Sequence, residues 1–212
     1  MKEQTKFVKL SEISHRNFLS PAPVNGLFDV RFKRNTDYFK PIGLWYSMKH
    51  YWLENLDLEY RHDLINYKIP PKPAKQYDIT GRYLYEIQIK PRYKTDINNI
   101  DPNKLLVIRT VSDLNKFSKK YKSSRRTFTK LFDKIHSNLI TKDTKLIRPV
   151  VVDAVFDLDW YKISKDFAGI EIPVFLKKTH TLFGKTPWYY GWDIASGNIW
   201  NMVVIDSLKL IK

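Results

Sequence analysis

The sequence predicts an α+β protein with several antiparallel strands and few helices. Several short segments alternate between apolar and polar residues, as strands with one buried face do. Only a few segments carry the spacing of three and four residues that marks an amphipathic helix. With 212 residues, 43% of them hydrophobic and 15% aromatic, the chain is long and apolar enough for one domain with a packed core. We therefore expect residues 1–212 to form a single α+β domain.

Strands dominate the predicted elements of the first half. Residues 7–18 read as a strand that leads into a turn, and residues 42–47 as a short buried strand that follows Pro41. Residues 49–57 are expected to form a helix. Residues 83–90 alternate most regularly, with tyrosines and isoleucines on one face, and predict a half-buried strand.

The next predicted pair is a strand at 104–110 and a helix after it. Ser112 is a candidate N-cap for that helix because its hydroxyl can accept from a free backbone N–H. Leu114, Phe117 and Tyr121 then recur at helical spacing and form an apolar face. Together with a second apolar pattern further on, they predict a basic helical segment at about 112–139.

The last third predicts a short helix and two strands. Residues 157–167 have the pattern of a helix, and residues 169–176 alternate as a strand. Pro173 lies inside that strand and favours an edge position, because proline has no N–H to donate. Residues 196–197, a Ser-Gly pair, predict a turn before a closing strand at 199–205.

The charge of the chain favours an anionic partner. There are 37 Lys+Arg against 22 Asp+Glu, a formal net charge of +15. We therefore expect binding to a polyanion, DNA or RNA. No RNP motif or zinc finger supports reading of a specific sequence. The candidate nucleic-acid-binding residues are Lys119, Lys120, Lys122, Arg125, Arg126 and Lys130.

Aromatic residues lie between these cations, and two interpretations of them stay open. In the first, Phe117, Tyr121 and Phe128 stack on bases while the cations follow the phosphate backbone. In the second, the aromatic side chains belong to the core and the cations are a solvated face.

The residues that are missing exclude several kinds of site. The chain has no cysteine, which excludes disulfides, thiolate metal sites and a cysteine nucleophile. It is compatible with the cytoplasm or another reducing intracellular compartment. No leader sequence is visible, and no run approaches the roughly 18 apolar residues of a membrane span. We therefore expect no membrane partner, and the scattered histidines predict no metal site.

Acidic residues leave one further option open. Asp153, Asp157 and Asp159 could converge in a metal-dependent nuclease. Asp157 and Asp159 also fit the start of a helix, where acids complement the helix dipole. We favour the helix start.

Three short motifs occur in a suggestive order. The first places His15 before Arg16 in Ile-Ser-His-Arg. The second is Gly43-Leu-Trp-Tyr-Ser on a predicted buried strand, and the third is a strand that carries Glu171. This order resembles the ADP-ribosyltransferase-like fold family, in which a histidine strand, a Gly-aromatic-aromatic-hydroxyl strand and a glutamate strand follow one another.

The resemblance implies a split antiparallel β-sandwich with a few peripheral helices, whose cleft binds NAD as substrate. It implies that His15 hydrogen-bonds the ribose of NAD, and that Tyr46 or Trp45 packs on the nicotinamide ring. Ser47 would support the position of that strand. Glu171 would hold a ribose hydroxyl and stabilise the cation that forms as nicotinamide leaves.

Two residues depart from the family pattern. Arg16 follows the histidine where many members have glycine. Gly169 stands two residues before Glu171, where enzymes that modify arginine carry an acid or amide. We therefore expect nucleic acid or a nucleic-acid-associated protein as acceptor. The alternative is a non-enzymatic nucleic-acid-binding or structural protein, in which the Gly-aromatic strand is only core.

Overall fold

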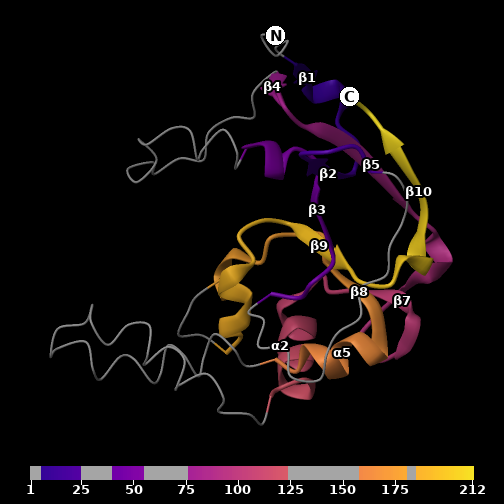
Figure 1. Cartoon of the computed structure of the whole chain (residues 1–212). Coiled ribbons are helices and arrows are strands. Elements are labelled where there is room, and N and C mark those ends of the chain that lie inside the picture. The colour runs from indigo at the N-terminus through magenta and orange to yellow at the C-terminus, as the bar shows by residue number, and fades with distance from the viewer. Residues whose placement is uncertain (1–5, 25–39, 55–75, 124–157, 181–184) are drawn as a thin grey trace, which may run out of the picture.

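The structure is a computed structural model, which describes residues 6–24, 40–54, 76–123, 158–180 and 185–212. The largest unit among them is one sheet with helices packed on it (Figure 1). The strands are β1 (Phe7–Lys9), β2 (Arg16–Ser20), β3 (Leu44–Met48), β4 (Gln76–Asp78), β5 (Tyr83–Ile89), β6 (Lys94–Thr95), β7 (Asp101–Val107), β8 (Phe167–Ile172), β9 (Ser196–Ile199) and β10 (Ile205–Leu210). The named helices are α2 (Val111–Lys120) and α5 (Trp160–Asp166), with 3₁₀ turns η1 (Leu10–Glu12), η3 (Pro91–Tyr93), η5 (Lys177–Thr179), η6 (Pro187–Gly191) and η7 (Met202–Val204). Residues 51–54 are also helical, within the helix expected at 49–57, whose residues 55–57 lie outside the described ranges.

The main sheet has eight strands in the order β10-β5-β2-β3-β9-β8-β7-β6. Its pairs are antiparallel from β10 to β8, whereas β7 pairs in parallel with both β8 and β6. Strands β1 and β4 form a separate two-stranded sheet. The prediction of an α+β protein with mostly antiparallel strands and few helices is confirmed.

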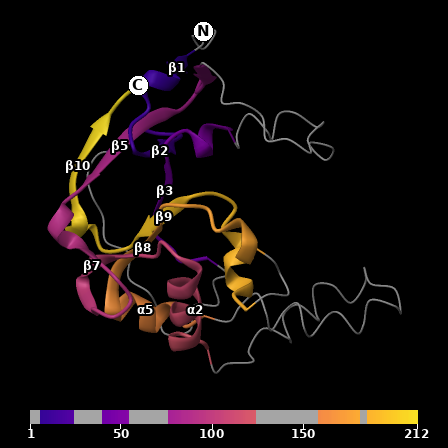
Figure 2. The ribbon, with the colours of Figure 1, turned by 180° about the vertical axis from the view of Figure 1, so that it is seen from behind.

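The sheet is strongly curled, and each of its faces carries a core (Figures 1 and 2). The inner face encloses apolar side chains from both halves of the sheet, among them Phe18, Tyr85, Leu105 and Ile199. The outer face of β7, β8 and β9 is covered by α2, α5 and η6. Burial on both faces explains why β8 is almost continuously apolar.

The helices begin where their caps place them. Thr110, and not Ser112, is the N-cap of α2: its hydroxyl oxygen accepts from the Asp113 backbone N–H at 3.1 Å. Thr110 also donates to the Asp113 carboxylate at 2.7 Å, which fixes the first turn. The helix ends at Lys120, and residues 124–139 of the expected basic helical segment lie outside the described residues.

Two expectations about strands are corrected. β8 (Phe167–Ile172) lies between β7 and β9 in the sheet and is not an edge strand. It ends before Pro173, which has no N–H to continue the ladder. The Ser-Gly pair at 196–197 begins β9 and does not form a turn, and β10 starts only at Ile205.

Candidate functional site

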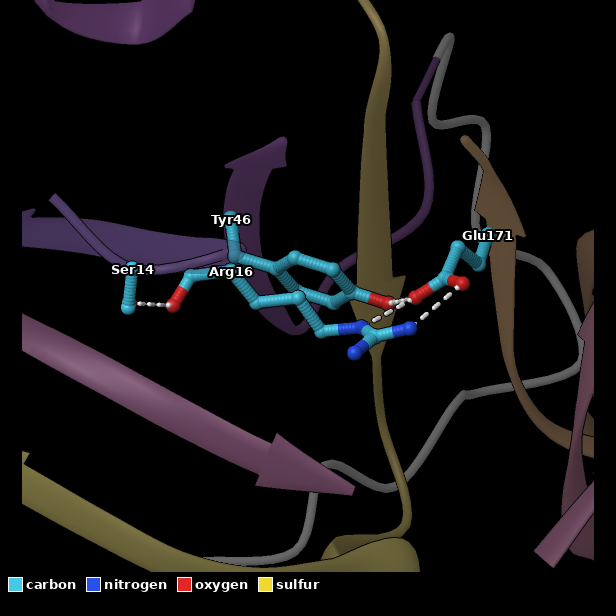
Figure 3. Close-up of polar contacts among 4 residues, drawn as sticks. All are labelled: Ser14, Arg16, Tyr46 and Glu171. Atoms are coloured by element: carbon cyan, nitrogen blue, oxygen red, sulfur yellow. Dashed lines mark hydrogen bonds and ion pairs between the residues drawn. The ribbon is translucent and has the colours of Figure 1, made fainter. Parts of the chain in front are cut away.

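A buried carboxylate is the centre of the candidate site. Glu171 on β8 has a side chain that is only 1% exposed, yet both of its oxygens are bonded. Arg16 donates from Nε to Oε2 at 2.6 Å and from Nη2 to Oε1 at 2.9 Å. The Tyr46 hydroxyl donates to Oε2 at 2.7 Å, so the carboxylate accepts three hydrogen bonds (Figure 3).

The register of three neighbouring strands brings Tyr46 to Glu171. In the ladders β3–β9 and β9–β8, Gly197 is the partner of both residues. A Cβ atom on Gly197 would collide with the Tyr46 ring and hydroxyl. Glycine at this position therefore lets the phenol cross over β9 and reach the carboxylate on the far side.

Arg16 reaches the same point from β2. It is paired with Met48, two residues beyond Tyr46 on β3, so Arg16 and Tyr46 project from the same face of the sheet. Its side chain is 11% exposed and lies beside the phenol of Tyr46 (Figure 3). Sequence reasoning noted Arg16 only as a departure from a motif. The available signal was that a buried glutamate on a strand needs a cationic partner.

The environment fixes the protonation of this cluster. Burial alone would raise the pKa of Glu171, but the hydrogen bonds and charge of Arg16, with the bond from Tyr46, lower it below its ordinary value. Burial, followed by the charge of Glu171, raises the pKa of Tyr46 well above its ordinary value. At neutral pH the site therefore holds a carboxylate, a guanidinium and a neutral phenol.

The start of β2 is held in place by a small polar network. The Ser14 hydroxyl lies 3.0 Å from the Arg16 carbonyl oxygen (Figure 3). It also lies 2.6 Å from Asn17 Oδ1 and donates its proton to one of these two oxygens. The amide of Asn17 donates to the carbonyl oxygens of Ser14 and Lys49. These bonds fix the backbone from which Arg16 projects.

His15 lies beside the cluster at the protein surface. Burial and the charge of Arg16 lower the pKa of His15, whereas the charge of Glu171 raises it. The imidazole is therefore neutral at pH 7 and can both donate and accept a hydrogen bond. It lines a hollow of about 400 Å³ together with Leu10, Ile13, Ser14, Lys49 and His50.

One residue of this hollow has an unusual backbone. Lys49 has φ = 49°, in the left-handed region that residues with a Cβ rarely occupy. Its N–H donates to the His15 carbonyl oxygen at 2.9 Å, and its own carbonyl accepts from Asn17. The strained turn is thus held by the same segment that positions His15 and Arg16.

Further cations surround the buried carboxylate. Lys94 on β6 is partly buried, and burial and the charge of Arg16 lower its pKa while Glu171 raises it. The charge of Arg109 also lowers the pKa of Lys94. Lys49 contributes a further positive charge next to His15. The described charges around Glu171 are therefore mostly positive and favour an anionic ligand.

Trp45 and Ser47 lie on the other face of β3 from Tyr46, because side chains alternate along a strand. The Trp45 ring is 4.6 Å from that of Trp192, and its Nε1 donates to the Pro41 carbonyl oxygen at 3.1 Å. Ser47 is buried, and its hydroxyl makes no hydrogen bond in the structure. Of the predicted cofactor-binding residues, the structure brings only Tyr46 and His15 to the Glu171 cluster.

Some of the remaining candidates lie among the residues that the structure describes, and the others lie outside them. Lys119, Lys120 and Lys122 are exposed at the end of α2. Asp159 is the N-cap of α5 and accepts from the Lys162 N–H at 3.0 Å, as the helix-start interpretation expects. The other residues of these sets lie outside the described ranges: Arg125, Arg126, Lys130, Asp153 and Asp157.

Among the described residues, no group of three or more histidines and acids is arranged to hold a metal ion. No helix there is long and apolar enough to cross a membrane.

Comparisons of the chain with protein-family models, with curated proteins and with solved structures found no match.

Proposed function

We propose that this chain transfers ADP-ribose from NAD to an acceptor, with Glu171 and Tyr46 at the reacting centre. The observation that carries this proposal is the meeting of Tyr46 and Glu171, which are 125 residues apart, in one hydrogen bond beside His15. A protein in which these motif residues served only local packing would not require them to meet. The hydrogen bond between Tyr46 and Glu171 therefore favours an ADP-ribose transferase over a non-enzymatic protein.

The ionised carboxylate suits the chemistry of this transfer. In the reaction the bond between C1′ of the ribose and the nicotinamide nitrogen breaks, and its electron pair stays on nicotinamide. Positive charge develops at C1′, and a fixed carboxylate stabilises it without having to take up a proton. The acceptor then forms the new bond to C1′ and releases its own proton to solvent.

Arg16 is the feature that this mechanism must accommodate. It occupies both oxygens of Glu171, so a ribose hydroxyl can bind the carboxylate only in exchange for one of these bonds. The proposal is that Arg16 holds Glu171 ionised and oriented before NAD binds. When NAD binds, Arg16, with Lys94, then turns toward the diphosphate.

The acceptor that fits best is a nucleic acid or a protein bound to one. The net charge of +15 attracts such acceptors. Gly169, in the position two residues before Glu171, offers no side chain that could orient an arginine acceptor.

The test is nicotinamide release from NAD by wild type, E171Q and Y46F, with E86Q as control. Glu86 lies on β5 and its change to glutamine alters the net charge by the same amount as E171Q. We expect E171Q to lose activity by at least about a hundredfold, the lower end of the effect of one preorganised electrostatic group. E86Q should match wild type.

The folding of the variants must be followed in the same experiment, since E171Q removes the charge that balances Arg16. Y46F is the milder change: it removes one hydrogen bond and leaves the ion pair in place. A Y46F protein that is folded and fully active would contradict a role for Tyr46 at the reacting centre.

A second function has one observation in its favour. Glu171 is 1% exposed and fully bonded, which is also how a purely structural buried ion pair is built. In that case the chain is a non-enzymatic nucleic-acid-binding protein. It would then bind no NAD at millimolar concentration, and E171Q would affect only stability.

A further inference from the structure

Helix α2 presents three lysines on one face. Lys116, Lys119 and Lys120 are spaced by three and four residues, so they are neighbours on the helix surface. All three are exposed, whereas Leu114 and Phe117 on the opposite side are fully buried in the outer core. The lysines therefore project into solvent away from the sheet.

Helix α5 adds two more lysines next to these. It lies beside α2 in both views of the molecule (Figures 1 and 2). The ammonium groups of Lys120 on α2 and Lys162 on α5 lie 5.5 and 5.7 Å from the centroid of the same ring, that of Tyr121. Lys165, three residues beyond Lys162, is also exposed.

The connection between the helices is fixed by backbone bonds. The Asp159 N–H donates to the Tyr121 carbonyl oxygen at 2.9 Å, and Lys122 forms an antiparallel bridge with Leu158. The two sets of lysines are thus held together by the fold.

The acids of these two helices are engaged in holding the structure. Asp113 is bonded to Thr110, Asp159 caps α5, and Asp166 accepts from the Tyr121 hydroxyl at 2.7 Å. Among the described residues no acid forms an ion pair with any of the five lysines. Lys120 Nζ also donates to the Ile97 carbonyl oxygen at 3.4 Å, a bond that leaves its charge unneutralised. Within the described part of the chain, no acid neutralises the charge of these lysines.

We infer that these lysines form a docking surface for the phosphate backbone of double-stranded nucleic acid, separate from the Glu171 site. This lysine surface consists of Lys116, Lys119, Lys120, Lys162 and Lys165. The charge is complementary to a duplex, which carries about one negative charge per 1.7 Å of its axis.

The aromatic side chains decide between a duplex and a single strand. Phe117 and Tyr121 have no exposed surface and belong to the outer core, so they cannot stack on bases. Of the two interpretations, assignment to the core is correct for Phe117 and Tyr121, whereas Phe128 lies outside the described residues. Tyr161 on α5 is half-buried, and the Lys165 ammonium lies 4.3 Å from the centroid of its ring. A surface whose rings are buried or lie under ammonium groups follows phosphates, and binding should be independent of sequence.

The test is the binding of a fluorescent random-sequence duplex at several salt concentrations. The variant replaces Lys119, Lys120, Lys162 and Lys165 with alanine. The control replaces four lysines that are exposed on other elements, Lys9, Lys177, Lys178 and Lys209. Both proteins lose four charges, so a difference between them reports position and not net charge.

We expect the test variant to bind at least about tenfold more weakly at 0.1 M salt. The slope of log K against log salt should become shallower by about 0.9 for each lost phosphate contact. The affinity of the control variant for the duplex should change much less. Charges more than about 10 Å from a phosphate are largely screened at that salt concentration. E86Q, which changes a side chain on β5, should bind the duplex as wild type does.

Four outcomes would overturn the inference. They are an equal loss in both lysine variants, no duplex binding by wild type, tighter binding to acidic lipid vesicles than to the duplex, and a preference for single strands. All the substituted lysines are exposed, so circular dichroism should show every variant folded. A double variant, K162E/K165E, provides a second test that leaves α2 intact and should still weaken binding.

Discussion

The hydroxyl of Tyr46 reaches Glu171 across a strand because the residue between them, Gly197, has no side chain. Three strands that are distant in sequence, β3, β9 and β8, therefore meet in one polar contact. This relationship explains a glycine within a strand, where it would otherwise weaken the ladder.

Replacing Gly197 with alanine should destabilise the protein. The new methyl group would collide with the Tyr46 ring, which is fully buried and cannot move aside without losing its bond to Glu171. We expect a loss of about 1–3 kcal/mol in the free energy of unfolding, measured by denaturant titration. Unchanged stability would show that the ring does not cross β9 at this point.

Removing Arg16 should be more costly than removing the whole ion pair. In R16Q the buried carboxylate of Glu171 keeps its charge and loses its cationic partner. We expect a destabilisation of about 3–5 kcal/mol. The double variant R16Q/E171Q leaves no buried charge and should recover a large part of that loss. Single and double variants of equal stability would contradict the pairing of these two charges.

Stability should fall at acid pH through Glu171. Its pKa in the folded state is lowered below the ordinary value of 4.5, because the bonds and charge of Arg16 outweigh the effect of burial. The unfolded chain therefore binds this proton first as the pH falls. The stability that ionised Glu171 contributes is fully present above pH 4.5. It is lost as the pH falls through the pKa of Glu171 in the folded state.

The stability difference between wild type and E171Q, measured by denaturant titration at several pH values, isolates this effect from other acids. It should be constant at neutral pH and shrink below pH 4.5. A difference that does not change with pH would contradict the lowered pKa of Glu171.

His15 should titrate below its ordinary pKa of 6.5, and its neighbours should move it in opposite directions. Burial and Arg16 lower the pKa, whereas Glu171 raises it. E171Q should therefore lower the pKa of His15 further, and R16Q should raise it. Proton NMR of the imidazole gives the pKa of His15 in wild type and both variants. A pKa that is unchanged in both variants would place His15 away from the cluster.

The sequence predicted local elements better than long-range contacts. Regular alternation identified β5, and helical spacing identified α2, since both patterns depend on near neighbours. Pro173 has no N–H to donate, as the sequence indicated. The consequence is that β8 ends before Pro173, and not that β8 lies at an edge of the sheet. The parallel pairing of β7 with β8 joins segments that are distant in the sequence, and it left no signal there.

The same limit applies to the candidate site. Tyr46 and Glu171 were found through the order of short motifs, and the structure joins them. Alternation along β3 could have shown that Trp45 and Ser47 point away from Tyr46. Arg16 was missed as the partner of Glu171, because only the strand order β2-β3-β9-β8 brings those residues together.

The most direct test of the central proposal measures NAD binding by calorimetry and nicotinamide release for wild type and E171Q. The account predicts that both proteins bind NAD, that wild type releases nicotinamide, and that the variant does so at least about a hundredfold more slowly. If folded wild type binds no NAD at millimolar concentration, or if E171Q releases nicotinamide at the wild-type rate, the proposed role of Glu171 is contradicted.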